Sequence, residues 1–105
     1  MSNGMVYMNI HDVRGERIVA ICDEELYGAK LVDTRLGIVF HVSEPFYGGQ
    51  KVPLDYALSI AREATIINLV GKRSVEAAIR EGLVHPDAVL DIAGIPHAQV
   101  VKTPY

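Results

Sequence analysis

The segment from Ile66 to Gly82 constrains the fold of this chain more than any other part of the sequence. An apolar run, Ile66–Val70, ends at a glycine, and Lys72–Glu81 then has the periodicity of an amphipathic helix that stops at Gly82. The apolar face of this helix is formed by Val75, Ala78 and Ile79. The pattern predicts a helix over Lys72–Glu81, preceded by either a short strand or a helix extension over Ile66–Val70.

A second helix is predicted to begin at Pro53, because the fixed backbone of proline suits the first position of a helix. Apolar residues follow at the spacing of a single helix face: Leu54, Ala57, Leu58 and Ala61. The other short apolar or alternating runs predict strands at Met5–Ile10, Arg17–Cys22, Lys30–Asp33, Gly37–Val42, Val89–Ile92 and Gln99–Lys102.

Polar and glycine-rich segments connect these elements. Asp12–Gly15 is predicted to turn the chain between the first two strands, and Asp23–Gly28 to form one helical turn capped by Asp23. Ser43–Lys51 is predicted to be a loop. Strands before and after a helical middle indicate an α+β fold. We expect one compact domain over residues 1–105, with a mostly antiparallel sheet packed on two principal helices.

Composition narrows the classes of function. The net charge of −3 gives no general attraction to nucleic acid, although a local basic patch stays possible. Cys22 is the only cysteine and lies in an apolar run, which predicts a small buried hydrophobe. No signal peptide or membrane-spanning run is present, so we expect a cytoplasmic protein. The four histidines lack metal-binding spacing, and neither a metal site, a cofactor nor a catalytic residue is predicted.

Gly71, Lys72, Arg73 and Ser74 form the first candidate site. If Gly71 is the N-cap, both cations lie in the first helical turn, beside free N–H groups that suit an anion such as phosphate. The alternative, which we favour, makes Ser74 the N-cap and leaves both cations in solvent. The phosphate-binding P-loop is excluded because the residue after Lys72 is arginine.

The second candidate site is the segment Phe46–Lys51. Phe46 and Tyr47 are adjacent aromatic residues in a glycine-containing loop, and outward rings could stack on nucleobases with Lys51 near a phosphate. In the alternative that we favour, Phe46 packs into the core and Tyr47 covers the loop. A third candidate site contains His97, which follows a Gly-Ile-Pro turn and precedes Gln99 by two residues, together with Asn68.

Four groups of residues resemble an archaeal family of conserved uncharacterised proteins, domain of unknown function 424. They are Asn68–Gly71, Ser74–Ile79, Glu81–Val84 and Gly94–Gln99, and Tyr7–Ile10 and Phe46–Gly49 add to the likeness. The resemblance covers nearly the whole chain. It implies an archaeal, cytoplasmic protein, supplies no catalytic residues, and gives a hint of a role around RNA or translation.

The leading hypothesis is a non-catalytic binding module for structured RNA or a ribosome-associated partner. The residues that would form its surface are Phe46, Tyr47, Lys51, Lys72, Arg73, His97 and Gln99. One alternative is a small enzyme or metabolite-binding protein with a pocket near Asn68, Gly71 and His97. Another is a protein-interaction subunit, which could be a homodimer that forms through an exposed strand edge.

Overall fold

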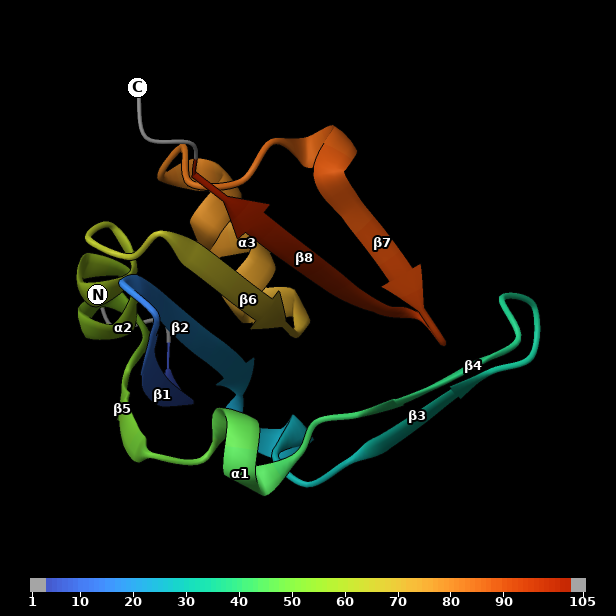
Figure 1. Cartoon of the computed structure of the whole chain (residues 1–105). Coiled ribbons are helices and arrows are strands. Elements are labelled where there is room, and N and C mark those ends of the chain that lie inside the picture. Colours follow the sequence, from blue (N-terminus) through green and yellow to red (C-terminus); the bar gives the residue numbers. More distant parts are fainter. Residues whose placement is uncertain (1–3, 103–105) are drawn as a thin grey trace.

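The computed structural model describes residues 4–102, which form two sheets with helices on both sides of the larger one (Figure 1). The larger sheet contains β1 (Met5–Val13), β2 (Glu16–Asp23), β5 (Gln50–Pro53), β6 (Ile66–Val70), β7 (Val89–Ile92) and β8 (Ile95–Val101), in the spatial order β5-β1-β2-β6-β8-β7. The smaller sheet is a hairpin of β3 (Lys30–Asp33) and β4 (Ile38–His41). The helices are α1 (Glu44–Tyr47), α2 (Leu54–Ala61) and α3 (Lys72–Arg80), with 3-10 turns η1 (Glu24–Leu26) and η2 (Pro86–Ala88).

The fold confirms the predicted α+β class and the mostly antiparallel sheet with two principal helices. Neighbouring strands of the larger sheet are antiparallel, except for β2 and β6, which are parallel. The segment Ile66–Val70 is therefore a strand rather than a helix extension. No helix in the described part of the chain, residues 4–102, has the length and apolar character needed to cross a membrane.

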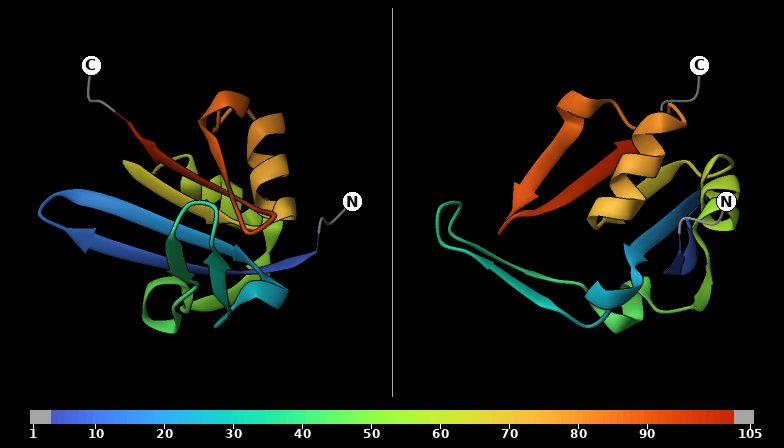
Figure 2. Two further views of the ribbon diagram at one scale, coloured as in Figure 1. Left: turned by 90° about the vertical axis from the view of Figure 1, so that its right-hand side faces the viewer. Right: turned by 180° about the vertical axis from the view of Figure 1, so that it is seen from behind.

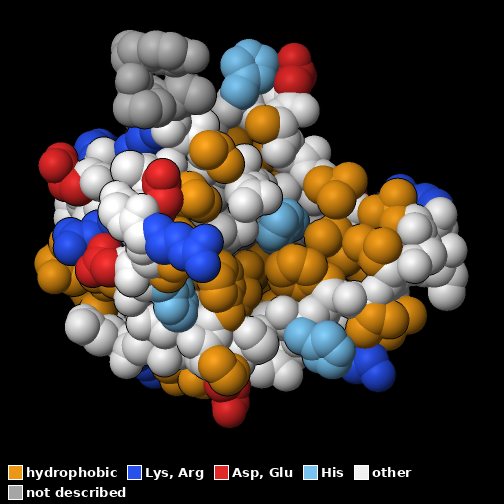
Figure 3. All heavy atoms as spheres, in the orientation of Figure 1, with side chains coloured by type: hydrophobic (Ala, Val, Ile, Leu, Met, Phe, Trp, Pro, Cys, Tyr) orange, Lys and Arg blue, Asp and Glu red, His pale blue; other side chains and the backbone are white. Residues whose placement is uncertain are grey.

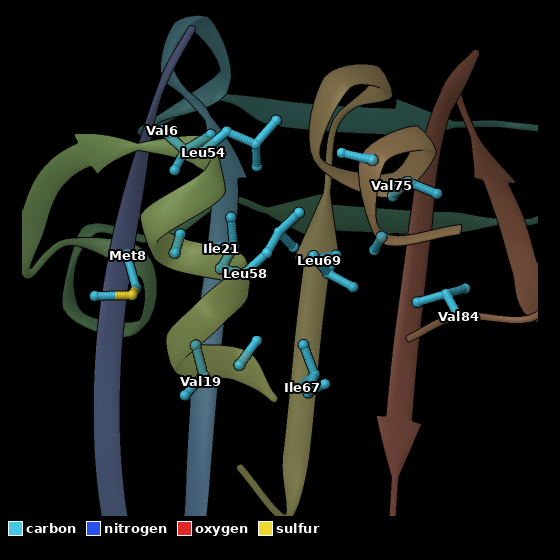
Figure 4. Packing of buried hydrophobic residues seen from close by; sticks show 14 of the residues in the cluster. Val6, Met8, Val19, Ile21, Leu54, Leu58, Ile67, Leu69, Val75 and Val84 are labelled. Atoms are coloured by element: carbon cyan, nitrogen blue, oxygen red, sulfur yellow. The ribbon is translucent and has the colours of Figure 1, made fainter. Parts of the chain in front are cut away.

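The main hydrophobic core lies between the sheet and the pair α2 and α3 (Figure 4). The predicted apolar face of α2 is confirmed, because Leu54, Ala57, Leu58 and Ala61 are all buried. On α3, Val75 and Ala78 are buried, whereas Ile79 is only partly buried against the same core. The two helices thus cover one face of the sheet and leave the other face to different elements.

The opposite face of the sheet is covered only in part. A second cluster joins Ala20, Cys22 and Val70 of the sheet to Val42 and Tyr47, which come from the end of the hairpin and from α1. Figure 2 shows the hairpin β3–β4 extending away from α1 along this side of the molecule. Burial raises the pKa of the Cys22 thiol to about 12, in agreement with its predicted role as a buried hydrophobe.

Several predicted boundaries are wrong. The predicted loop Ser43–Lys51 contains α1 and the start of β5, because Pro45 suits a helix start and Val52 pairs with Val6 of β1. Pro53 is extended and precedes the first helical residue, Leu54. The last strand begins at Ile95 rather than Gln99, because Ala93 and Gly94, both with positive φ, make a tight turn from β7 into β8.

Candidate functional site

The start of α3 differs from the prediction that Ser74 is its N-cap. Gly71 occupies the N-cap position with a φ of 118°, and the helix begins at Lys72. A Cβ at Gly71 would lie 2.3 Å from the carboxyl carbon of Asp23, so the close approach of these two chain segments needs a glycine there. Ser74 is buried one turn further on, where its hydroxyl donates to Asp23 over 2.6 Å.

The carboxylate of Asp23 occupies the position in which this helix start would hold a ligand anion. Its Oδ2 accepts from the N–H of Arg73 at 3.0 Å, and its Oδ1 accepts from the N–H of Ser74 at 2.9 Å. Asp23 was predicted to cap η1, but no side-chain cap bond is formed there. Because free N–H groups in the first turn are what bind anions at helix starts, the internal carboxylate replaces the phosphate considered from the sequence.

The next two carboxylates along the chain pair with two of the predicted phosphate-binding cations. Glu24 lies 2.5 Å from Nζ of Lys51, and Glu25 lies 2.6 Å from Nη2 of Arg73. The hydrogen bond to Glu24 raises the pKa of Lys51, so this lysine stays protonated and paired with Glu24. Lys72 is exposed, and between residues 4 and 102 it has no carboxylate partner. Three consecutive acidic residues thus leave little positive charge for RNA at this end of α3.

The aromatic pair of α1 has the opposite arrangement to the one favoured from the sequence. Tyr47 is buried in the second cluster, and Phe46 is half-buried with its ring stacked on His11, the two ring centres lying 5.0 Å apart at an interplanar angle of 9°. The Nε2 of His11 lies 2.8 Å from the carbonyl oxygen of Phe46. Asn9 donates to the carbonyl oxygen of Pro45 at 3.2 Å. Tyr47 is therefore not available to stack on a base, whereas Phe46 keeps part of its ring exposed.

The strand register places a row of amide side chains across the face of the sheet that lacks α2 and α3. Asn9 on β1 pairs with Ala20 on β2, Ala20 pairs with Asn68 on β6, and Asn68 pairs with Gln99 on β8. Among residues 4–102, the side-chain amides of Asn68 and Gln99 have no hydrogen-bond partner. Asn68 is half-buried and Gln99 is exposed, so two unpaired donor–acceptor groups lie side by side at the surface.

His97 extends this row on the same face of β8, two residues from Gln99. Its ring meets Phe40 of the hairpin edge-on, with ring centres 4.8 Å apart at 64°. Burial lowers the pKa of His97 below the ordinary value of 6.5, so the ring is neutral at pH 7. Within the described chain, its ring nitrogens have no hydrogen-bond partner. Asn68, His97 and Gln99 therefore form a cluster of neutral polar groups, which we call the amide–histidine cluster.

The fold does not bring all the candidate residues to one surface. Asn68, His97 and Gln99 share the open face of the sheet, whereas the Cα of Gly71 faces Asp23 beside α3. Gly71 nevertheless lies beside His97, because its N–H donates to the carbonyl oxygen of Pro96 at 2.9 Å and the preceding residue, Val70, pairs with His97. Phe40 was not singled out from the sequence, because its neighbour His97 is 57 positions away in the chain and no local pattern links them.

The surroundings of the amide–histidine cluster are largely apolar. In the register, Val70 and Leu90 flank His97, while Ile66 and Val101 lie one row beyond Asn68 and Gln99. Figure 3 shows hydrophobic side chains in a band from the hairpin β3–β4 across the centre of the molecule, with a histidine in its middle. The described residues hold no group of three or more side chains suited to bind a metal ion. The arrangement suits recognition of an uncharged ligand edge rather than an ionic group.

These features define a class of protein, an α+β domain whose sheet is covered by helices on one face and presents a neutral polar cluster on the other. The chain belongs to the family of proteins of unknown function DUF424, whose model matches residues 11–103, and this confirms the resemblance seen in the sequence. An uncharacterised conserved protein from the archaeon Methanopyrus kandleri has a similar structure, with a TM-score of 0.80 and 30% sequence identity over 97% of this chain and 96% of that chain. None of the curated proteins matches.

Proposed function

We propose that the protein is a non-catalytic binding module in RNA- or ribosome-related work, and that unpaired RNA bases contact the amide–histidine cluster. The observation that carries this proposal is the cluster itself: Asn68, His97 and Gln99 are neutral, adjacent on one sheet face, and without hydrogen-bond partners among residues 4–102. Polar groups on a folded surface that bind nothing within the protein are available to a ligand.

The chemistry of the cluster fits a base edge better than a phosphate. Each amide offers both a donor and an acceptor, which is the combination that the edge of a nucleobase presents. Sequence-specific RNA recognition mostly targets unpaired bases, which are stacked on rings and hydrogen-bonded along their edges. Phe40, edge-on to His97, supplies a ring beside the cluster, and Leu90 supplies an apolar side chain. The cluster contains no charged side chain.

The pairing of the cations predicts an unusual salt dependence for an RNA-binding protein. Of the ten Lys and Arg residues, those in ion pairs with carboxylates are Arg17, Arg35, Lys51, Arg62 and Arg73. Lys102 donates to two backbone carbonyl oxygens. Few cations are left that could contact RNA phosphates and so displace the counterions bound to them. Because the slope of log K against log salt is about −0.7 per phosphate contact for single strands, we expect a shallow slope of about −1 to −2.

The proposal is tested by fluorescence anisotropy with single-stranded RNA 12-mers of varied sequence and with a matched RNA duplex. We expect single strands to bind and the duplex to bind much more weakly. Asn68→Ala and Gln99→Ala should each raise Kd about three- to tenfold, which corresponds to the loss of about one hydrogen bond. Gln50→Ala is the matched control, because Gln50 is an exposed glutamine on β5, away from the cluster.

Two results would contradict the proposal. If no single-stranded RNA binds at low salt, RNA is not the ligand, and the metabolite alternative at Asn68 and His97 becomes the one to pursue. If RNA binds but Lys72→Glu abolishes binding while Asn68→Ala has no effect, the contact is at the start of α3. The salt series gives an independent readout, since contact through phosphates would produce a steep slope.

A further inference from the structure

The hairpin β3–β4 is a separate two-stranded sheet that is fixed at both of its ends. At its base, Gly28 donates to Val42 at 2.9 Å and Val42 donates to Ala29 at 2.8 Å. At its tip, the buried carboxylate of Asp33 accepts from the N–H of Ala93 in the β7–β8 turn at 2.7 Å. Isolated two-stranded hairpins are marginally stable, so these attachments hold the hairpin in one position.

An ion-pair network strengthens the attachment of the tip. The Arg35 guanidinium lies 3.0 Å from Oδ2 of Asp33 and 3.3 Å from Oδ1 of Asp91 on β7. Between tip and base, Leu31 and Phe40 point inward and pack against the second hydrophobic cluster. The residues that alternate with these two therefore lie on the outer face of the hairpin, away from the sheet.

The outer face of the hairpin exposes a pair of valines. Val32 and Val39 are directly opposite each other, with 52% and 53% of their surface exposed. Lys30 and His41, also opposite each other and exposed, lie beside them. The only acidic residue from Lys30 to His41 is Asp33, which is buried. In a protein of net charge −3, residues 30–41 thus place exposed valines beside Lys30 on this face and contribute no exposed carboxylate to it.

The hairpin also has strand edges that pair with no other strand among residues 4–102. The β3 edge carries Lys30, a residue type that discourages strand pairing, and its other end is held by the Asp33 contacts. The β4 edge, Ile38–His41, contains no Lys, Arg, Asp or Glu. It is therefore the edge that an additional strand could extend.

We propose that the β4 edge and the Val32–Val39 pair form a docking surface for an extended segment of a partner protein whose outward-facing residues, every second one along the strand, are in turn apolar and acidic. The segment would add as a strand beside β4, with main-chain hydrogen bonds for affinity and with alternate side chains on the outer face. On that face an apolar residue of the segment would cover Val39, and the acidic residue two positions along would face His41 and, across β4, Lys30. This site is distinct from the amide–histidine cluster and independent of the RNA proposal.

Charge and chemistry disfavour other occupants. A second copy docked through the same face would bring Lys30 against residues 30–41 of the other copy, whose only carboxylate, Asp33, is buried. RNA would find one lysine for a phosphate and the ring of His41, but two aliphatic side chains and no amide with which a base could pair. A protein strand with apolar and acidic residues would pair with Lys30, cover the exposed valines and supply hydrogen bonds to the unpaired edge of β4.

The test is a titration of the 15N-labelled protein followed by NMR. The probes are an eight-residue peptide with threonine at every second position and with valine and glutamate in turn at the positions between, and a matched peptide with lysine in place of glutamate. We expect the glutamate peptide to shift the amides of residues 38–41 saturably and to slow their hydrogen exchange, and the lysine peptide to have no effect. Val39→Lys should weaken this binding at least tenfold. Val13→Lys, at a similarly exposed valine of β1 (48%), should leave it unchanged.

Far-UV circular dichroism first checks that Val39→Lys folds, and Val32→Lys serves as a second variant that leaves the β4 sequence intact. The proposal is overturned if neither peptide shifts the β4 amides, if both do so equally, or if the valine substitutions have no effect. It is also overturned if these amides shift with protein concentration alone, which would assign the edge to a second copy, or if single-stranded RNA shifts them instead of the peptide.

Discussion

Asp23, the last residue of β2, and Ser74, in the first turn of α3, are joined by two hydrogen bonds to one carboxylate oxygen, 2.9 Å from the Ser74 nitrogen and 2.6 Å from its hydroxyl. Both residues are buried. The contact spans 51 positions of sequence and ties the central strand β2 to the helix that covers it. It also removes the most evident anion site of the chain, because a side chain of the protein binds where a phosphate would bind.

Asp23→Ala should destabilise the protein by about 2–3 kcal/mol, because it removes a helix cap and leaves the buried Ser74 hydroxyl without its acceptor. Urea unfolding measures this loss, and hydrogen exchange at Arg73 and Ser74 localises it. Glu76→Ala, at an exposed position of the same helix, is the control and should change stability by less than about 0.5 kcal/mol. Equal losses in the two variants would show that the Asp23 cap contributes little.

Gly71→Ala should cost more than about 2 kcal/mol, because the φ of 118° strains any other residue and the added Cβ would contact the Asp23 carboxyl group. Gly82→Ala provides the comparison. Gly82 also has a positive φ, 77°, but no atom lies within 4 Å of the added Cβ, so only the conformational cost of about 1 kcal/mol applies. The difference between the thermal midpoints of the two variants measures how much the contact with Asp23 adds to the destabilisation of Gly71→Ala. Similar midpoints would contradict the close approach of Gly71 and Asp23.

Lys72 and Arg73 should respond differently to charge reversal, although they are adjacent. Lys72→Glu should change the free energy of unfolding by less than about 0.5 kcal/mol, because Lys72 is exposed and unpaired among residues 4–102. Arg73→Glu should cost several times as much, because the new carboxylate would lie near Asp23 and Glu25. Urea unfolding of the two single variants checks this order, and raising the salt concentration should reduce the Arg73→Glu effect by screening.

Asp33 should make part of the stability of the fold dependent on pH. Backbone N–H groups of Ala93 and Leu36, with Arg35, lower the pKa of Asp33 from 3.8 to about 2. A lowered folded-state pKa means that the carboxylate stabilises the protein fully above about pH 4 and that this stabilisation is lost as the pH falls toward 2. Thermal midpoints of the wild type should therefore fall through this window more steeply than those of Asp33→Asn. Parallel curves would mean that Asp33 is not the responsible group.

Elements with a local pattern could be predicted from the sequence. The apolar spacing from Leu54 to Ala61 defined the buried face of α2, and alternation or apolar runs placed most strands to within a few residues. Errors arose where local signals competed. Ser74 is a good cap residue, but the neighbouring Gly71 is required by Asp23, a residue that no local window contains. Phe46 and Tyr47 have similar apolar character, so their sequence could not decide which ring becomes buried.

By itself, the sequence determined the α+β class, the two amphipathic helices and the buried cysteine, because each depends on residue types within a short window. It also determined the family resemblance, which depends on short groups of residues spread along the chain. Tertiary structure alone decided that Asp23, Glu24 and Glu25 occupy or neutralise the predicted anion-binding groups, and that Asn68, His97 and Gln99 meet on one open face. The physical reason is that strand register and helix docking bring together residues far apart in the chain. A single-residue shift of β8 against β6 would turn Gln99 to the opposite face.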